Sequence, residues 1–148
     1  MHFHILIGTT SGNTEYLADE VSKALIEEGH QATLHDQPSD TEVPMKNAHW
    51  LLCIATHGAG EYADSIYPFM QSLTDNRPDL SSIHYALIGI GDSSYDTFCQ
   101  AAQDADALLS GLGARRICES LTIDMFNDLD PEANAVNWLS TWKSARSE

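Results

Sequence analysis

Residues 3–14 read FHILIGTTSGNT, a continuous apolar run that leads directly into a turn of glycine, hydroxyl and amide residues. A strand inside a parallel sheet has this continuous apolar character because helices cover both of its faces. Beyond the turn, Leu17, Val21, Ala24 and Leu25 follow a helical period, with acidic residues off that stripe. The stretch therefore predicts a strand, a tight turn and a helix, which is the first half of a βαβ unit.

The same alternation of apolar runs and helix-periodic segments continues along the chain, with no repeat, linker or low-complexity stretch. We therefore expect one domain, residues 1–148, which is long enough to bury a sizeable core. The expected strands are 3–7, 31–35, 50–55, 85–90 and 116–121.

Three more helices follow from periodicity and from signals at their ends. The stripe from Phe98 to Leu112 is followed by Gly113, which suits the left-handed position after a helix. Asp64 is the expected N-cap of a shorter helix that carries Pro68 in its first turn. The last helix is predicted by the spacing of Ala135, Trp138, Leu139 and Trp142.

The character of the strands also predicts their order. The first, third and fourth are continuously apolar and belong inside the sheet, whereas the second and fifth alternate and belong at its edges. With right-handed crossovers, the expected fold is α/β, a doubly wound five-stranded parallel sheet in the order 2-1-3-4-5 with helices on both faces. A ligand crevice should open where the winding reverses, between strands one and three.

Composition excludes several classes of function. Lys plus Arg number 7 against 22 Asp plus Glu, and the net charge of −15 repels nucleic acid and anionic membranes and favours a basic protein partner. No apolar run approaches the length of a membrane span, and no export signal precedes the first strand, so we expect a soluble cytoplasmic protein. The three cysteines form no CxxC pair, which argues against a disulfide framework or a zinc site.

Three polar loops follow the first, third and fourth strands, at residues 8–14, 56–62 and 91–95. In the first loop, hydroxyls and backbone N–H groups at the start of a helix can bind a phosphate without Lys or Arg. The loop lacks the GxxxxGK[ST] pattern of nucleoside triphosphatases and the GxGxxG pattern of dinucleotide-binding proteins. A receiver domain would need acidic residues where Thr9, Thr10 and Thr56 stand.

The other two loops each carry a ring. His57 and Tyr95 flank the predicted crevice and could hold a flat heterocycle between them, while Gly58 lets the backbone approach that heterocycle closely. Trp50 opens the third predicted strand, far from the crevice, and Trp138 and Trp142 lie on the stripe of the last helix, so we interpret all three tryptophans as structural.

These loops resemble those of the flavodoxin-like FMN proteins over the whole chain. Residues 89–99, GIGDSSYDTFC, resemble the third FMN loop of flavodoxins, and residues 9–14 resemble their phosphate loop. Residues 55–61, ATHGAGE, resemble the middle loop in the FMN domains of diflavin reductases. One departure is His57, where many relatives place a tyrosine or tryptophan, so stacking strength and redox potential are open.

The resemblance implies FMN as the cofactor and assigns a role to each loop. The phosphate loop would comprise Thr9, Thr10, Ser11, Gly12, Asn13 and Thr14. The inner face of the ring would be lined by Thr56, His57, Gly58, Ala59 and Gly60. The outer face and the pyrimidine edge would be contacted by Gly91, Asp92, Tyr95, Phe98 and Cys99.

The resemblance also implies a function in electron transfer, with no catalytic side chain and no metal, because the flavin performs the redox chemistry. The expected protein is a monomer that accepts electrons from a flavodoxin or ferredoxin reductase-type donor and passes them to a basic-faced acceptor, such as an enzyme of biotin synthesis. Two alternatives stay open, an NAD(P)H-dependent flavin quinone reductase and a flavodoxin-like docking module without cofactor.

Overall fold

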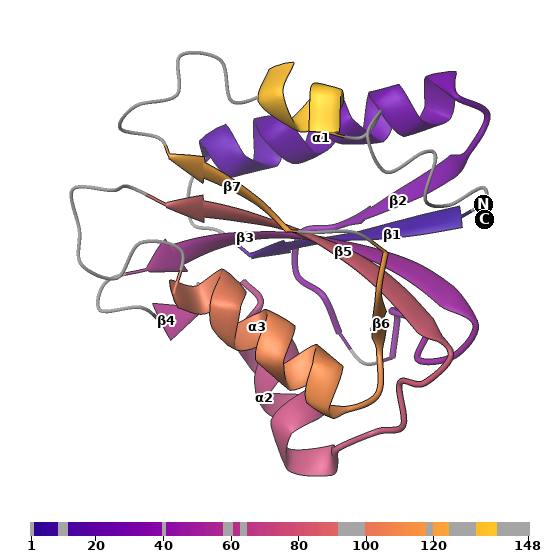
Figure 1. The fold of residues 1–148 in the computed structure, drawn as a ribbon, viewed down its shortest axis with the longest axis vertical. Coiled ribbons are helices and arrows are strands. Elements are labelled where there is room, and N and C mark those ends of the chain that lie inside the picture. The colour runs from indigo at the N-terminus through magenta and orange to yellow at the C-terminus, as the bar shows by residue number, and fades with distance from the viewer. Residues whose placement is uncertain are drawn as a thin grey trace.

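The computed structural model describes residues 2–8, 12–39, 41–57, 61–62, 65–91, 100–117, 120–124 and 133–138. In these ranges a twisted sheet lies between two helical layers (Figure 1). Helix α1 (Gly12–Glu27) and the helical residues 133–138 cover one face. Helices α2 (Tyr67–Asn76) and α3 (Gln100–Gly111) cover the other. The predicted covering of both faces is thus confirmed.

The centre of the sheet is parallel. Strand β1 (His2–Gly8) pairs with β2 (Gln31–His35) on one side and with β3 (Ala48–His57) on the other, and β3 pairs with β5 (Ile83–Gly91). The path through the sheet is β2-β1-β3-β5-β6. Counted along the chain this is the predicted order 2-1-3-4-5, with the reversal of winding between β1 and β3.

The predicted fifth strand, 116–121, is wrong in its extent. The structure places two short strands there, β6 (Arg115–Arg116) and β7 (Leu121–Asp124), and both pair with β5. From Tyr85 to Ile88 the β5 strand advances three residues, whereas its partners advance five, from Arg116 to Leu121. Two extra residues therefore interrupt the ladder, as in a large β-bulge.

Two further features differ from the prediction. The short strand β4 (Glu61–Tyr62) pairs antiparallel with the end of β3, which adds a hairpin to the parallel sheet. Helix α2 has Ile66, not Asp64, as its N-cap residue, and no side-chain hydrogen bond caps it. Pro68 does lie in the first turn, where its missing N–H costs no intrahelical bond.

Alternation along the strands sends apolar side chains into two cores. On β3, Trp50 and Leu52 face the core under α2 and α3, while Leu51 and Cys53 face the core under α1. All four side chains are fully buried. Removing each large apolar side chain from water contributes about 1.5–3 kcal/mol, so the central strands are strongly held on both faces.

The details of the cores bear out the structural interpretation of two tryptophans. Trp50 is buried against Phe69 and donates its indole N–H to the carbonyl of Pro44 at 2.9 Å. Trp138 packs against the core under α1. Trp142 lies outside the described residues. Gly113 has a φ of 98°, which confirms its predicted left-handed role after α3.

A cluster of imidazoles ties β1 to the edge strand β2. His4 Nδ1 and His35 Nε2 lie 3.0 Å apart in a hydrogen bond, and the His2 ring stacks on His4 at 4.3 Å between centroids. His2 also bonds the Thr33 hydroxyl at 2.6 Å. Burial, with smaller contributions from His2 and His35, lowers the pKa of His4 to about 4. Burial likewise lowers the pKa of His35, although Glu42 and Asp36 oppose the shift.

This cluster predicts how stability depends on pH. Because the pKa of His4 in the folded chain lies below the unfolded value of about 6.5, the unfolded chain takes up a proton first. Stability is therefore full above that value and falls as the pH approaches about 4. One group contributes at most about 1.4 kcal/mol per pH unit, and partial exposure reduces this.

We expect His4→Gln to lose less stability than the parent between pH 7 and pH 5, measured as the midpoint of urea unfolding at each pH. The matched control is His84→Gln, an exposed histidine on β5. It should keep the pH dependence of the parent. Equal pH dependence in parent and His4→Gln would contradict the assignment.

Candidate functional site

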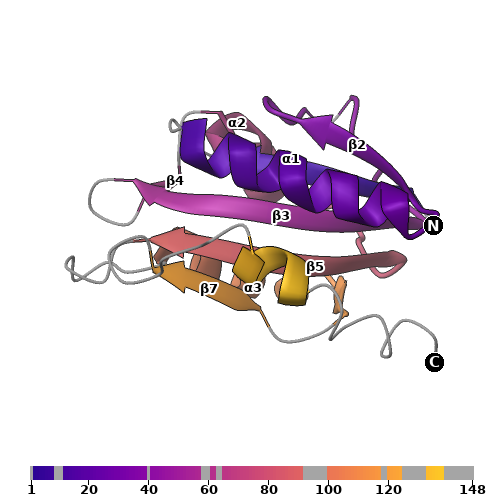
Figure 2. The ribbon, with the colours of Figure 1, turned by 90° about the horizontal axis from the view of Figure 1, so that it is seen from above.

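The carboxyl ends of the three central strands meet at one edge of the sheet. The register pairs Gly8 of β1 with Ile54 of β3, and Ala55 of β3 with Ile90 of β5. Seen from above, β3, β5 and β7 all point toward this edge (Figure 2). The three polar loops predicted to carry chemistry therefore all leave from the same edge, next to the reversal of winding between β1 and β3.

The first loop is short and ends in a helix. Strand β1 ends at Gly8 and α1 begins at Gly12, so residues 9–11 alone separate them. Gly12, Asn13 and Thr14 form the first turn of α1, whose backbone N–H groups have no partner within the helix. A helix start of this kind, together with hydroxyl-rich neighbours in sequence, suits a phosphate group.

The second loop is the tip of a tight hairpin, which the sequence reasoning missed. Thr56 pairs with Tyr62 and His57 with Glu61 across β3 and β4, so only residues 58–60 form the connection. Three-residue hairpin loops favour glycine, and two of the three residues here are glycines. That signal was available in the sequence, but the two-residue return strand is too short to give a pattern.

The third loop leaves from Gly91, the last residue of β5. Gly91 is partly buried and pairs with Asp124 of β7. Helix α3 resumes at Gln100 on the face opposite α1. The residues at which the three loops begin therefore lie at one edge of the sheet, as the sequence motifs predict.

Ten of the predicted cofactor-binding residues lie outside the described ranges: Thr9, Thr10, Ser11, Gly58, Ala59, Gly60, Asp92, Tyr95, Phe98 and Cys99. The other six are placed by their backbone: Gly12, Asn13, Thr14, Thr56, His57 and Gly91. Their roles in cofactor binding remain predictions.

The sequence did not predict that Ser65 and Ile66 contact the end of β1 at this edge. A Cβ atom at Gly8 would lie 2.6 Å from Cγ2 of Ile66, closer than real Cβ atoms approach. Ser65 donates its hydroxyl to the carbonyl of Ile7 at 3.3 Å. The short distance shows why residue 8 is a glycine, and only the tertiary packing reveals it.

The carboxyl edge of the sheet has no basic side chain among the described residues. Each described basic residue lies elsewhere: Lys46 before β3 begins, Arg77 at the far end of α2, and Arg115 and Arg116 beside the first residues of β5. Lys23 lies in the fourth turn of α1 and forms ion pairs with Asp19 and Glu20. An anion at this edge would therefore be held by hydrogen-bond donors and the helix dipole, without a cation from the described residues.

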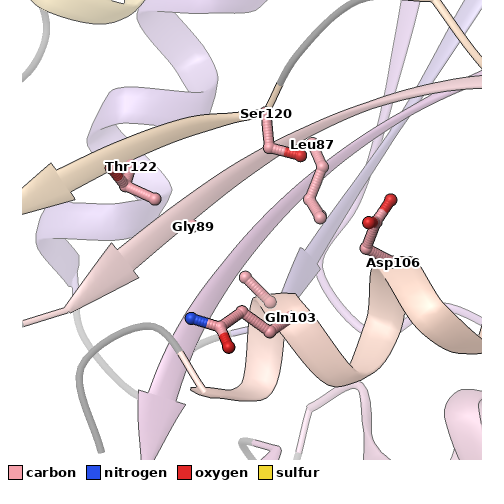
Figure 3. A pocket seen from close by; sticks show the side chains of 7 residues that line it. Leu87, Gly89, Gln103, Asp106, Ser120 and Thr122 are labelled. Atoms are coloured by element: carbon pink, nitrogen blue, oxygen red, sulfur yellow. The ribbon is translucent and has the colours of Figure 1, made fainter.

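A small pocket lies beside the interruption between β6 and β7 (Figure 3). It is lined by Leu87, Gly89, Ala102, Gln103, Asp106, Ser120 and Thr122. Its volume of about 70 Å³ holds about two waters, whereas ligand sites of drug size occupy about 300 Å³ or more. The pocket is therefore too small for a mononucleotide.

Beside the pocket, a polar network joins β5, α3 and β6. The hydroxyl of the buried Tyr85 donates to Oδ1 of Asp106 at 2.5 Å, and Arg116 contacts Oδ2 of Asp106 at 3.3 Å. Burial, followed by the hydrogen bond to Asp106, raises the pKa of Tyr85 above its ordinary value. The network pins α3 to the sheet far from the carboxyl edge.

Within the described ranges, no three His, Cys, Asp or Glu side chains are grouped to bind a metal ion. Among the same residues, no helix is both long and apolar enough to cross a membrane. Cys53 is fully buried in β3, and burial raises the pKa of its thiol to about 12. Cys118 lies outside the described residues.

The sheet order, with the ends of β1, β3 and β5 at one edge, defines a doubly wound α/β protein of the flavodoxin class. The family model for flavodoxin matches residues 5–138. The chain therefore belongs to the flavodoxin family, whose members are flavin-dependent electron carriers.

Individual relatives cover nearly the whole chain. A MioC homolog from Haemophilus influenzae is 37% identical over 142 residues, which is 96% of this chain and 97% of the relative. Flavodoxin YqcA from Escherichia coli is 34% identical over 139 residues and covers 93% of each chain. A point mutant of flavodoxin from Pseudomonas aeruginosa superposes with a TM-score of 0.89 at 29% identity over all of both chains.

The burial of Cys53 predicts that its thiol is inert in the folded protein. In a Cys99→Ser/Cys118→Ser background, we expect no reaction of the native protein with a thiol reagent, and one thiol per chain after unfolding in urea, because only the thiolate reacts. The reaction is followed by the absorbance of the released chromophore. Reaction of the native protein at the rate of the unfolded chain would contradict this.

Proposed function

We propose that the chain binds FMN at the carboxyl edge of the sheet and carries electrons between a reductase-type donor and an acceptor enzyme. The observation that supports this best is the convergence of β1, β3 and β5 on the edge from which all three FMN-like loops leave. When bound, FMN would supply reversible electron transfer at its ring. The chain would supply binding, exclusion of water and the surrounding charge.

Each loop has a separate task in this proposal. Residues 9–14 would bind the phosphate through hydroxyls and N–H groups at the start of α1. The β3–β4 hairpin would present His57 and Gly58 to one face of the ring, and Tyr95 would stack on the other. No described side chain is needed as an acid, base or nucleophile.

The charge of −15 would influence both the potential and the partners. Acidic surroundings disfavour added negative charge on a bound ring, which makes the reduced cofactor a stronger reductant. The same charge would steer the protein to basic faces on its donor and acceptor. An acceptor that needs low-potential electrons, such as an enzyme of biotin synthesis, fits this proposal.

Titration of the protein with FMN tests the binding site. We expect one FMN per chain, with quenching of its fluorescence, and Tyr95→Ala should weaken binding of FMN and riboflavin alike by about 5- to 150-fold, since one aromatic stacking contact is worth about 1–3 kcal/mol. The control is Tyr67→Ala, a half-exposed tyrosine on α2 outside the three loops. It should leave both affinities unchanged.

Unquenched FMN fluorescence in the parent would overturn the proposal and favour a docking module without cofactor. Steady oxidation of NADPH by the purified protein alone, with a quinone as acceptor, would favour the quinone reductase. An electron carrier should oxidise NADPH only when a reductase is added.

The proposed steering predicts a dependence on salt. The second-order rate of reduction by a flavodoxin reductase should fall by about 10-fold or more as salt screens charges beyond a Debye length of about 10 Å at 0.1 M. Glu15→Gln should slow the reaction more than Glu27→Gln, because these exposed residues lie at opposite ends of α1 and only Glu15 is near the carboxyl edge. Stopped-flow absorbance measures both, and a salt-independent rate would refute steering.

A further inference from the structure

The end of β1 is held by the two residues that precede α2. The position that a Cβ of residue 8 would take lies 2.6 Å from Cγ2, 3.1 Å from Cβ and 3.4 Å from Cδ1 of Ile66. One residue earlier, the carbonyl of Ile7 accepts the hydroxyl of Ser65 at 3.3 Å. Both of the last residues of β1 are therefore in contact with the same dipeptide.

Alternation along β1 explains why the contact falls on residue 8. Leu6 faces the core under α2 and α3, whereas Ile5 and Ile7 face the core under α1. Residue 8 lies on the same face as Leu6, since side chains alternate along a strand. A side chain there would point directly at Ile66, so glycine is needed for the close approach.

Ile66 is itself firmly placed. Its side chain is fully buried, and its carbonyl accepts the N–H of Met70 at 3.0 Å in the first turn of α2. Phe69 and Met70, which follow it, are buried in the same core. Displacement of Ile66 would therefore require displacement of α2, and Ile66 acts as a fixed stop for β1.

Because Ile66 contacts the end of β1, we expect it to influence binding of the phosphate group more than binding of the ring. Gly8 directly precedes residues 9–14, and α1 starts only four residues after it. A small shift of Gly8 is therefore passed to the first turn of α1 with little slack. The segments proposed to contact the ring leave from β3 and β5. Strand β3 pairs with β1 on one side and with β5 on the other, so both strands are held by the ladder of the sheet.

We propose that Ile66 and Ser65 are positioning residues for the phosphate of the cofactor, an inference that rests on the proposed function. They hold Ile7 and Gly8, and through them the start of the segment that binds the phosphate. Correct placement of N–H and hydroxyl donors to within about 0.5 Å is what such a site requires.

The test compares FMN with riboflavin, which lacks the phosphate. In Gly8→Ala the Kd for FMN should rise by about 10-fold or more, while the Kd for riboflavin should change by less than about 3-fold. Adding Ile66→Ala removes Cγ2 and Cδ1, so Gly8→Ala should then raise the Kd for FMN by only about 3-fold relative to Ile66→Ala alone. Fluorescence quenching measures both ligands.

The matched control is Gly111→Ala, a glycine in α3 whose added Cβ would meet nothing within 4 Å. It should leave both affinities at the values of the parent. Far-UV circular dichroism and thermal unfolding verify that each variant is folded. If Gly8→Ala fails to fold, Ser65→Ala replaces it, and its ratio of Kd for FMN to Kd for riboflavin should rise by about 2- to 5-fold.

The outcomes separate this inference from the proposed function. If the parent binds neither ligand, the proposed function fails and the inference with it. If the parent binds FMN but the variant, Gly8→Ala or its replacement, weakens FMN and riboflavin equally or not at all, the inference alone is overturned. Equal effects of Gly8→Ala with and without Ile66→Ala would likewise overturn the role of Ile66.

Discussion

Burial of β1, β3 and β5 on both faces is the constraint on which the rest of the structure depends. Ile5, Leu6, Leu51 and Leu52 have no exposed surface, and Ile88 in β5 is equally buried. The central strands pair in parallel, and parallel neighbours need crossover connections, whose helices cover both faces of the sheet. Their carboxyl ends consequently lie at one edge, and the three polar loops leave the sheet from that edge.

The sequence predicted those parts of the fold that depend on local periodicity, and failed where distant pairing decides. The positions of β1, α1 and α3 and the order of the central strands follow from apolar runs and a glycine after α3. The edge strand was misplaced because the two extra residues between Arg116 and Leu121 are set by pairing with β5. The N-cap at Ile66 was missed because tertiary packing, not a side-chain hydrogen bond, fixes it. The loop motifs located the edge of the site, whereas the contact between Gly8 and Ile66 joins residues 58 positions apart and leaves no local pattern.

The described basic residues lie away from the carboxyl edge of the sheet. The described Lys and Arg residues lie in the second half of α1, at the end of α2 or near the amino ends of β3 and β5. A phosphate bound by neutral donors keeps its own charge, and the acidic surface adds to it. Both effects work against further negative charge on a flavin held at this edge, which favours a low potential. The charge of the chain is therefore consistent with both a strong reductant and a basic partner.

Polar groups in the two halves of the sheet have different consequences. Away from the loops, His4 is hydrogen-bonded to His35, and Tyr85 is linked through Asp106 to Arg116. Such satisfied networks fix the helices and the edge strand in one arrangement. At the carboxyl edge, the first turn of α1 presents N–H groups that the helix itself cannot pair. A folded domain is only marginally stable. The paired polar groups elsewhere in the sheet therefore permit unpaired N–H donors at the carboxyl edge to be kept for a ligand. The contact of Ile66 with Gly8 keeps these donors in place until the ligand binds.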